Sequence, residues 1–168
     1  MSKIAVIVTN YVEDIEYTSP VEALQAAGHE VVTIENEANN TFTGKNGGEF
    51  KADLGIADAN PEDFDGLLVP GGFSPDILRA DDRYVEFTRH FFLTNKAIFS
   101  ICHGPQIFIQ TGLTKGRRMT AYTSVVPDLY YAGAIVEDKP VVIDENLVTS
   151  RTPDDLDAFN KAIVETLN

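Results

Sequence analysis

The residues best suited to chemistry are a cysteine and a histidine that directly follow a short apolar run. Cys102 is the chain's single cysteine and stands in Ser100-Ile101-Cys102-His103-Gly104. This small-x-nucleophile-x-Gly pattern predicts a strained elbow between a strand and a helix. A helix N-terminus stabilises a thiolate, so we expect a lowered pKa for Cys102. The alternative, a small buried apolar residue, is the common state of a free cysteine. The position and the neighbours favour a reactive thiol.

Two further groups are candidates for a partner of this thiol. His103 is a candidate base, although the residue after a nucleophile on an elbow generally points away from it. The acidic run Glu13-Asp14-Ile15-Glu16 could instead supply a protonated carboxyl that donates a hydrogen bond to the thiolate, if burial raises its pKa. A solvated loop that complements a helix dipole is the alternative for this run. No histidine follows position 103, so the chain cannot complete the Ser-Asp-His order of α/β-hydrolases.

A double glycine follows another apolar run, in Pro70-Gly71-Gly72. Glycines let a backbone approach a ligand closely, so the N–H groups of Gly72 and His103 are candidates for an oxyanion hole. A simple turn is the alternative reading of this segment.

Short apolar runs rich in β-branched residues alternate with helical patterns along the chain. Continuous apolar runs predict strands that are buried on both faces, as in a parallel sheet. The expected strands are residues 4–8, 31–34, 66–69 and 97–101, followed by a hairpin of residues 141–143 and 147–149.

Helix signals stand between these runs. The first expected helix starts at Ser19 as N-cap, with Pro20 at its first position, and ends at Gly28. The last starts at Thr152, where Pro153 follows an N-cap threonine. Between them, we expect helices at residues 82–93, 104–110 and 124–132.

The alternation predicts one doubly wound α/β domain over residues 1–168, with a mostly parallel sheet and helices on both faces. Ligands bind outside the carboxyl ends of the strands in such sheets, which directs attention to residues 10–18, 70–76 and 102–105. Residues 41–53 are expected to form a surface hairpin with a mobile tip and no chemical role.

Composition excludes several classes of function. The 168 residues contain 13 Lys and Arg against 26 Asp and Glu, a formal charge of −13. Such a surface repels phosphate backbones and anionic lipids, so we expect neither a nucleic-acid nor a membrane partner. A lone cysteine forms no internal disulfide, and we find no metal-binding cluster or phosphate-binding loop, so no metal or cofactor is expected. The first apolar run is too short for a secretory signal, which predicts a cytoplasmic protein.

Three segments together resemble the ThiJ/PfpI family of the class I glutamine-amidotransferase-like superfamily, whose fold is flavodoxin-like. They are residues 13–20, residues 68–72 and residues 97–106, the last with its core Ile101-Cys102-His103-Gly104-Pro105-Gln106. Residues 130–134 and 148–156 also resemble the PfpI branch. The resemblance implies that Cys102 is the nucleophile, that a Glu16 carboxyl contacts its sulfur, and that Gly72 and His103 supply oxyanion-hole N–H groups.

The resemblance also marks where this chain departs from the family. In protease-like members, the histidine after the nucleophile pairs with a glutamate from a neighbouring subunit. That position is Asp76 here, one methylene shorter. Another branch carries a histidine where this chain has Ala121-Tyr122-Thr123, so Tyr122 replaces that group or the group is absent. Glu13, Gly71 and Tyr122 are the candidate substrate-binding residues.

Three functions are compatible with these residues. The first is a cofactor-free, glyoxalase-like or deglycase-like enzyme, in which Cys102 adds to a small reactive carbonyl or a glycated substrate and Glu16 moves the proton. The second is an intracellular cysteine peptidase that uses Cys102, His103 and Asp76 within an oligomer. The third is a redox sensor or protein-protective factor, in which Cys102 is oxidised beside Glu16. The resemblance also implies a homodimer or a larger homo-oligomer.

Overall fold

A seven-stranded sheet forms the centre of the molecule, which a computed structural model describes over residues 1–168. The strand order is β10-β11-β7-β6-β1-β2-β5. Neighbouring strands pair in parallel except β10 with β11. The strands are β1 (Lys3–Ile7), β2 (Glu30–Glu35), β5 (Leu54–Gly55), β6 (Gly66–Val69), β7 (Ala97–Ile101), β10 (Val141–Asp144) and β11 (Leu147–Ser150). The predicted α/β fold with a mostly parallel sheet is confirmed.

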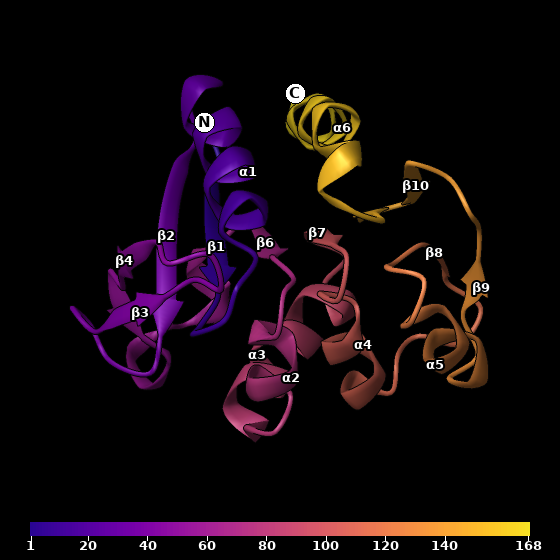
Figure 1. The fold of residues 1–168 in the computed structure, drawn as a ribbon, viewed down its shortest axis with the longest axis horizontal. Helices are drawn as coiled ribbons and strands as arrows, with labels where there is room; N and C mark the ends of the chain where they lie inside the picture. Colours follow the sequence, from indigo (N-terminus) through magenta and orange to yellow (C-terminus); the bar gives the residue numbers. More distant parts are fainter.

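Helices cover both faces of this sheet (Figure 1). Helices α1 (Asp14–Ala26) and α6 (Leu156–Leu167) pack on one face and contact each other. The opposite face is covered by α2 (Ser74–Leu78), α3 (Asp82–Leu93), α4 (Gln106–Thr111) and α5 (Val126–Tyr131). Two small sheets lie outside this frame: β3 (Thr41–Thr43) with β4 (Glu49–Lys51), and β8 (Arg118–Met119) with β9 (Ile135–Val136).

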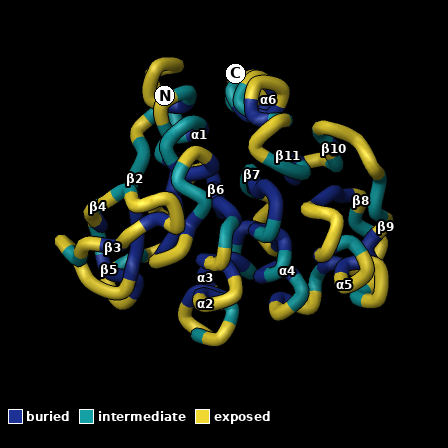
Figure 2. The backbone as a smooth tube through the Cα atoms, in the orientation of Figure 1, coloured by how far each residue is buried: buried dark blue, intermediate teal, exposed yellow.

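The continuous apolar runs of the strands follow from burial on both faces. In β1, Ile4 and Val6 face the core under α1 and α6, whereas Ala5 and Ile7 face the core on the other side. All four are fully buried. Figure 2 shows the inner strands buried beneath more exposed helices and loops. No helix has the length and apolar character needed to cross a membrane.

The first helix begins earlier than the sequence predicted. Helix α1 starts at Asp14, so Ser19 is not its N-cap and Pro20 lies inside it. Proline at this position removes the N–H that would bond to the Glu16 carbonyl. Burial of Tyr17, Pro20 and Leu24 against the sheet offsets that loss. As a result, Glu16 lies in the first turn of a helix and not in a loop. Gly28 follows the helix at φ +91°, as expected of its C-terminal cap.

The hairpin of β3 and β4 does not have the free tip that its glycines suggested. The Asp14 carboxylate accepts hydrogen bonds from the backbone N–H groups of Gly48 (2.8 Å) and Asn46 (3.0 Å). The Lys45 N–H donates to the Val12 carbonyl at 2.9 Å. The acidic segment therefore anchors the hairpin tip against the start of α1.

Three helix starts differ from the predicted positions. Thr152 makes no side-chain cap, and a 3-10 turn over Pro153–Asp155 precedes α6. Arg151 instead pairs with Asp155 at 2.9 Å, which holds this turn. Helices α4 and α5 each begin two residues later than expected, because turns occupy the segments after Cys102 and Thr123.

Candidate active site

Cys102 lies at the turn that joins β7 to the segment before α4. Its φ is +64°, a left-handed conformation that L-residues other than glycine adopt at a cost. The Gly104 N–H donates to the Ile101 carbonyl at 2.9 Å, and the Ser100 hydroxyl donates to the Val69 carbonyl at 2.9 Å. These contacts hold the strained elbow that the sequence predicted.

Gly104 is required for the tightness of this turn. A Cβ at this position would collide with the Ser100 hydroxyl and with the Val69 backbone carbonyl. We expect Gly104→Ala to lower the free energy of unfolding by about 2–4 kcal/mol, because the backbone of β6 cannot move aside. Urea unfolding, monitored by circular dichroism, measures this change.

Gly112→Ala is the matched control. Gly112 has a φ of +74° but open space around it, so alanine there costs about 1 kcal/mol for its conformation alone. Equal losses in the two variants would contradict the steric role assigned to Gly104.

The Glu16 carboxyl lies against the Cys102 thiol. Glu16 is fully buried, and its Oε1 accepts the Gly71 N–H at 3.0 Å. Oε2 has no hydrogen-bond partner, although Cys102 is close enough to the carboxyl to act on its pKa. Burial raises the pKa of Glu16 to about 8, against the lowering effects of Cys102 and the Gly71 N–H. Glu16 is therefore mostly protonated at neutral pH.

The pKa of Cys102 does not move in the expected direction. Burial and an ionised Glu16 raise the pKa of the thiol, whereas the N–H groups of His103 and Gly72 lower it. Helix α4 begins only at Gln106, so its N-terminus does not outweigh burial. Together, the two acids carry at most one negative charge near neutral pH. The sulfur can hold that charge only while Glu16 keeps its proton.

His103 faces the thiol, although its place in the sequence suggested otherwise. Its Nδ1 lies 3.3 Å from the Cys102 sulfur, and its Nε2 lies 3.4 Å from the Ser124 hydroxyl. The ring stacks on Tyr122 with centroids 4.9 Å apart. Burial and the Lys45 charge lower the pKa of His103, which favours a neutral imidazole that can exchange protons with the sulfur.

The two expected oxyanion-hole groups meet at the sulfur. The backbone N–H groups of Gly72 and His103 both act on the Cys102 sulfur and lower the pKa of its thiol. Gly72 has a φ of +70°, and a Cβ there would collide with the backbone of Tyr11 and Glu13. This close approach of two loops requires glycine at position 72.

A cavity of about 320 Å³ opens above the thiol. It is lined by Glu13, Glu16, Lys45, Gly72, Phe73, Cys102, His103, Tyr122 and Pro153. Glu13, Glu16, Gly72, Cys102, His103 and Tyr122 were candidates from the sequence. Gly71 lies beneath the cavity, where it holds Glu16.

Asp76 is the one candidate that lies apart. It is exposed on α2 and does not line the cavity, so within one chain it is not brought to His103. Nor does any group of three or more metal-ligating side chains occur in the molecule.

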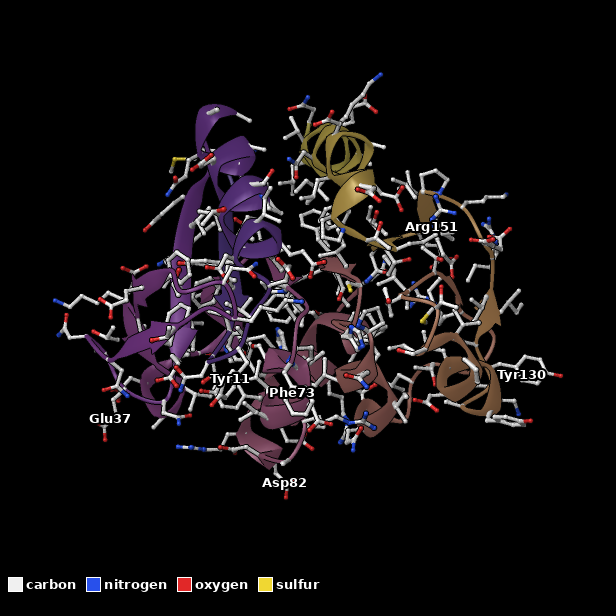
Figure 3. The ribbon with its side chains drawn as sticks, viewed as in Figure 1. Tyr11, Glu37, Phe73, Asp82, Tyr130 and Arg151 are labelled. Atoms are coloured by element: carbon white, nitrogen blue, oxygen red, sulfur yellow. The ribbon has the colours of Figure 1, made fainter.

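Lys45, Phe73, Ser124 and Pro153 were missed as site residues. Lys45 lies on the hairpin tip, and its Nζ is 2.7 Å from the Glu13 carboxylate. Phe73 follows the double glycine directly and is exposed beside Tyr11 (Figure 3). For Phe73, its position directly after Gly72 is a local sequence signal that could have placed it at the site. The others reach the site through contacts between distant parts of the chain.

A cysteine on an elbow at the carboxyl edge of a doubly wound sheet, beside a buried glutamate, places this protein among the α/β proteins whose candidate site is built around a cysteine. Comparison with known families agrees, since the DJ-1/PfpI family matches residues 2–166. This chain belongs to that family.

Similar proteins cover almost the whole chain. The Bacillus subtilis protein named "Putative cysteine protease YraA" is 55% identical over 166 residues, covering 99% of this chain and 96% of its own. General stress protein 18 of the same organism is 54% identical, with coverages of 95% and 94%.

Solved structures show the same fold. Drosophila melanogaster DJ-1beta superposes with a TM-score of 0.92 at 27% identity, over 99% of this chain and 91% of its own. A two-domain Anabaena variabilis protein with DJ-1/ThiJ/PfpI-like and ferritin-like domains gives a TM-score of 0.96 at 35% identity. The match spans 99% of this chain and 48% of that longer chain.

Proposed function

We propose that this protein is a cysteine-dependent enzyme that converts reactive small carbonyls, such as 2-oxoaldehydes or their adducts on amines and thiols, into 2-hydroxy acids. The observation that carries the proposal is the buried Glu16–Cys102 pair at a small cavity that Gly72 and His103 also line. This arrangement combines a nucleophile, a proton carrier and donors that can stabilise an oxyanion.

For a 2-oxoaldehyde, the reaction begins with attack of the Cys102 sulfur on the aldehyde carbon, while His103 Nδ1, 3.3 Å from the sulfur, accepts the thiol proton. The carbonyl oxygen gains the electron pair and takes a proton from Glu16, which forms a hemithioacetal. The Glu16 carboxylate then removes the proton from that carbon and returns it to the neighbouring carbon. The hydroxyl proton passes to the neighbouring oxygen, which leaves a 2-hydroxy thioester. Water hydrolyses the thioester, which releases the 2-hydroxy acid and restores the thiol, and the proton held by His103 returns to Glu16. The aldehyde carbon is oxidised and its neighbour is reduced. Overall, the 2-oxoaldehyde and one water give the 2-hydroxy acid, and no external oxidant or reductant is needed.

The size of the cavity supports a small substrate. A volume of about 320 Å³ lies at the lower end of the range for small-molecule pockets.

Incubation of the purified protein with methylglyoxal tests the proposal, with lactate measured by chromatography. Formation of lactate in proportion to protein is the expected result, and its absence with methylglyoxal and with amine or thiol adducts would reject it. A role in stress is consistent with the name of General stress protein 18.

Peptide hydrolysis is the second candidate. It is favoured by the 3.3 Å approach of His103 Nδ1 to the Cys102 sulfur and by the name of the YraA relative. A cavity of about 320 Å³ offers no extended groove to one chain, and Asp76 does not line it, so this activity would require a neighbouring subunit. Hydrolysis of casein by the protein, abolished by alkylation of Cys102, would establish it.

We infer that the protein forms a homodimer or a larger homo-oligomer. The inference rests on the family resemblance, and it agrees with the apolar side chains of Tyr11, Ile15, Phe73 and Ile77, which are exposed in the single chain. Sedimentation equilibrium is expected to give at least twice the 18.4 kDa of one chain. A single species of one-chain mass at micromolar concentration would contradict this expectation.

A further inference from the structure

Lys45 is the only lysine or arginine that lines the cavity above Cys102. Its Nζ lies 2.7 Å from Glu13 Oε2, while about half of its side chain (52%) stays exposed. An ammonium group has three donors. With one directed at Glu13, the others are open to the cavity and to solvent.

The structure holds this lysine in place over the site. Its backbone N–H donates to the Val12 carbonyl at 2.9 Å. Glu13 accepts from Asn46 Nδ2 at 2.7 Å through Oε1 and from Lys45 through Oε2, so both of its oxygens are engaged. The Glu13 side chain is only 15% exposed. Because Glu13 is itself fixed, Lys45 is aimed by the hairpin anchor and is not a freely moving surface charge.

Among the titratable side chains that line the cavity, Lys45 is the one that is positively charged near pH 7. The lowered pKa of His103 and the raised pKa of Glu16 leave both groups mostly neutral near pH 7. Glu13 pairs with Lys45 and offsets part of its charge, while two N–H donors of the Lys45 ammonium group stay open to an anion. An anion that enters this cavity therefore meets one fixed cation in a chain of net charge −13.

We propose that Lys45 is a specificity-determining residue that binds a carboxylate or phosphate group carried next to the reacting carbonyl. The inference rests on the proposed function and deepens it, because it makes anionic carbonyl compounds, and not neutral ones, the preferred substrates. The same contact would hold the carboxylate of a 2-hydroxy acid product. Glu13 would act as a positioning residue for Lys45.

Alkylation of Cys102 by two reagents of similar size, one anionic and one neutral, tests this assignment. Iodoacetate is anionic and iodoacetamide is neutral, and in both reactions the sulfur displaces iodide. The measured quantity is the ratio of the two rate constants in the full-length protein. We expect Lys45→Met to lower that ratio by about fivefold, the effect of one partly exposed ion pair. Lys45→Arg keeps the charge and should retain the ratio.

Lys51→Met is the matched control, because Lys51 is an exposed lysine on strand β4 of the same hairpin and does not line the cavity. An unchanged ratio in Lys45→Met, a loss in Lys45→Arg equal to that in Lys45→Met, or an equal fall in Lys51→Met would overturn the proposal. Failure of both reagents to alkylate Cys102 would overturn it too.

The test does not require turnover. A ratio that depends on Lys45 in a protein that forms no hydroxy acid would reject the proposed function and keep the anion preference. Lactate formation with a ratio independent of Lys45 would support the proposed function and reject the anion preference.

Discussion

Replacement of Cys102 by alanine or serine is expected to abolish hydroxy acid formation from methylglyoxal. Removal of a nucleophile lowers kcat by on the order of 10³-fold or more in enzymes whose nucleophile and base act as a unit. Serine keeps a hydroxyl at the same place but ionises far less readily than a thiol, so it should not restore activity. Lactate measured under saturating methylglyoxal is the readout.

Glu22→Gln serves as the control for this experiment. Glu22 is exposed on helix α1, and its side chain makes no hydrogen bond or ion pair, so this variant should match the unmodified protein. Circular dichroism confirms that each variant is folded. Cys102→Ala protein that still forms lactate at the original rate would show that the sulfur is not the nucleophile.

Glu16→Gln is the second variant with a large expected effect. The amide can still donate a hydrogen bond to the sulfur but cannot carry a proton between substrate atoms, so we expect kcat to fall by about 10²–10⁴-fold. Alkylation of Cys102 by iodoacetamide should be much less affected, because it needs no proton shuttle. Equal losses of turnover and of alkylation would contradict the assigned role.

The same variant should change how stability depends on pH. The pKa of Glu16 rises from 4.5 to about 8 on folding, so the folded state binds this proton more tightly than the unfolded state. Stability from this group is complete below pH 4.5 and is lost as the pH rises toward 8, by up to a few kcal/mol. Glu16→Gln should flatten this decline and unfold at higher urea than the unmodified protein at pH 9. Glu22→Gln should keep the decline.

Much of the fold was predictable because its signals are local. Each inner strand is buried on both faces, so its apolar run is continuous, as the residues Ile4 to Ile7 illustrate. Helix α1 was misplaced because Ser19 and Pro20 form a strong start signal. That signal was overridden by packing, since Pro20 and Tyr17 are buried in a helix that had already begun at Asp14. Burial of these side chains can therefore offset the cost of a proline inside a helix, which is about 3 kcal/mol.

The candidate site was predictable in part for a related reason. Cys102, His103 and Gly72 follow strands whose carboxyl ends meet at one edge of a parallel sheet, so their proximity follows from topology. Lys45 could not be found in this way. Its place depends on contacts of Glu13 and Asp14 with residues more than 30 positions away. The upward shift of the Cys102 pKa depends on burial, which no local pattern reveals.

The left-handed backbone of Cys102 also has a consequence for how this protein would respond to selection. A non-glycine residue in this conformation costs about 1 kcal/mol, which glycine would not lose. A screen that rewards heat resistance alone is therefore expected to favour glycine at position 102, in a protein that is more stable and inert. Persistence of cysteine there in a population of variants would then itself report that the thiol is in use.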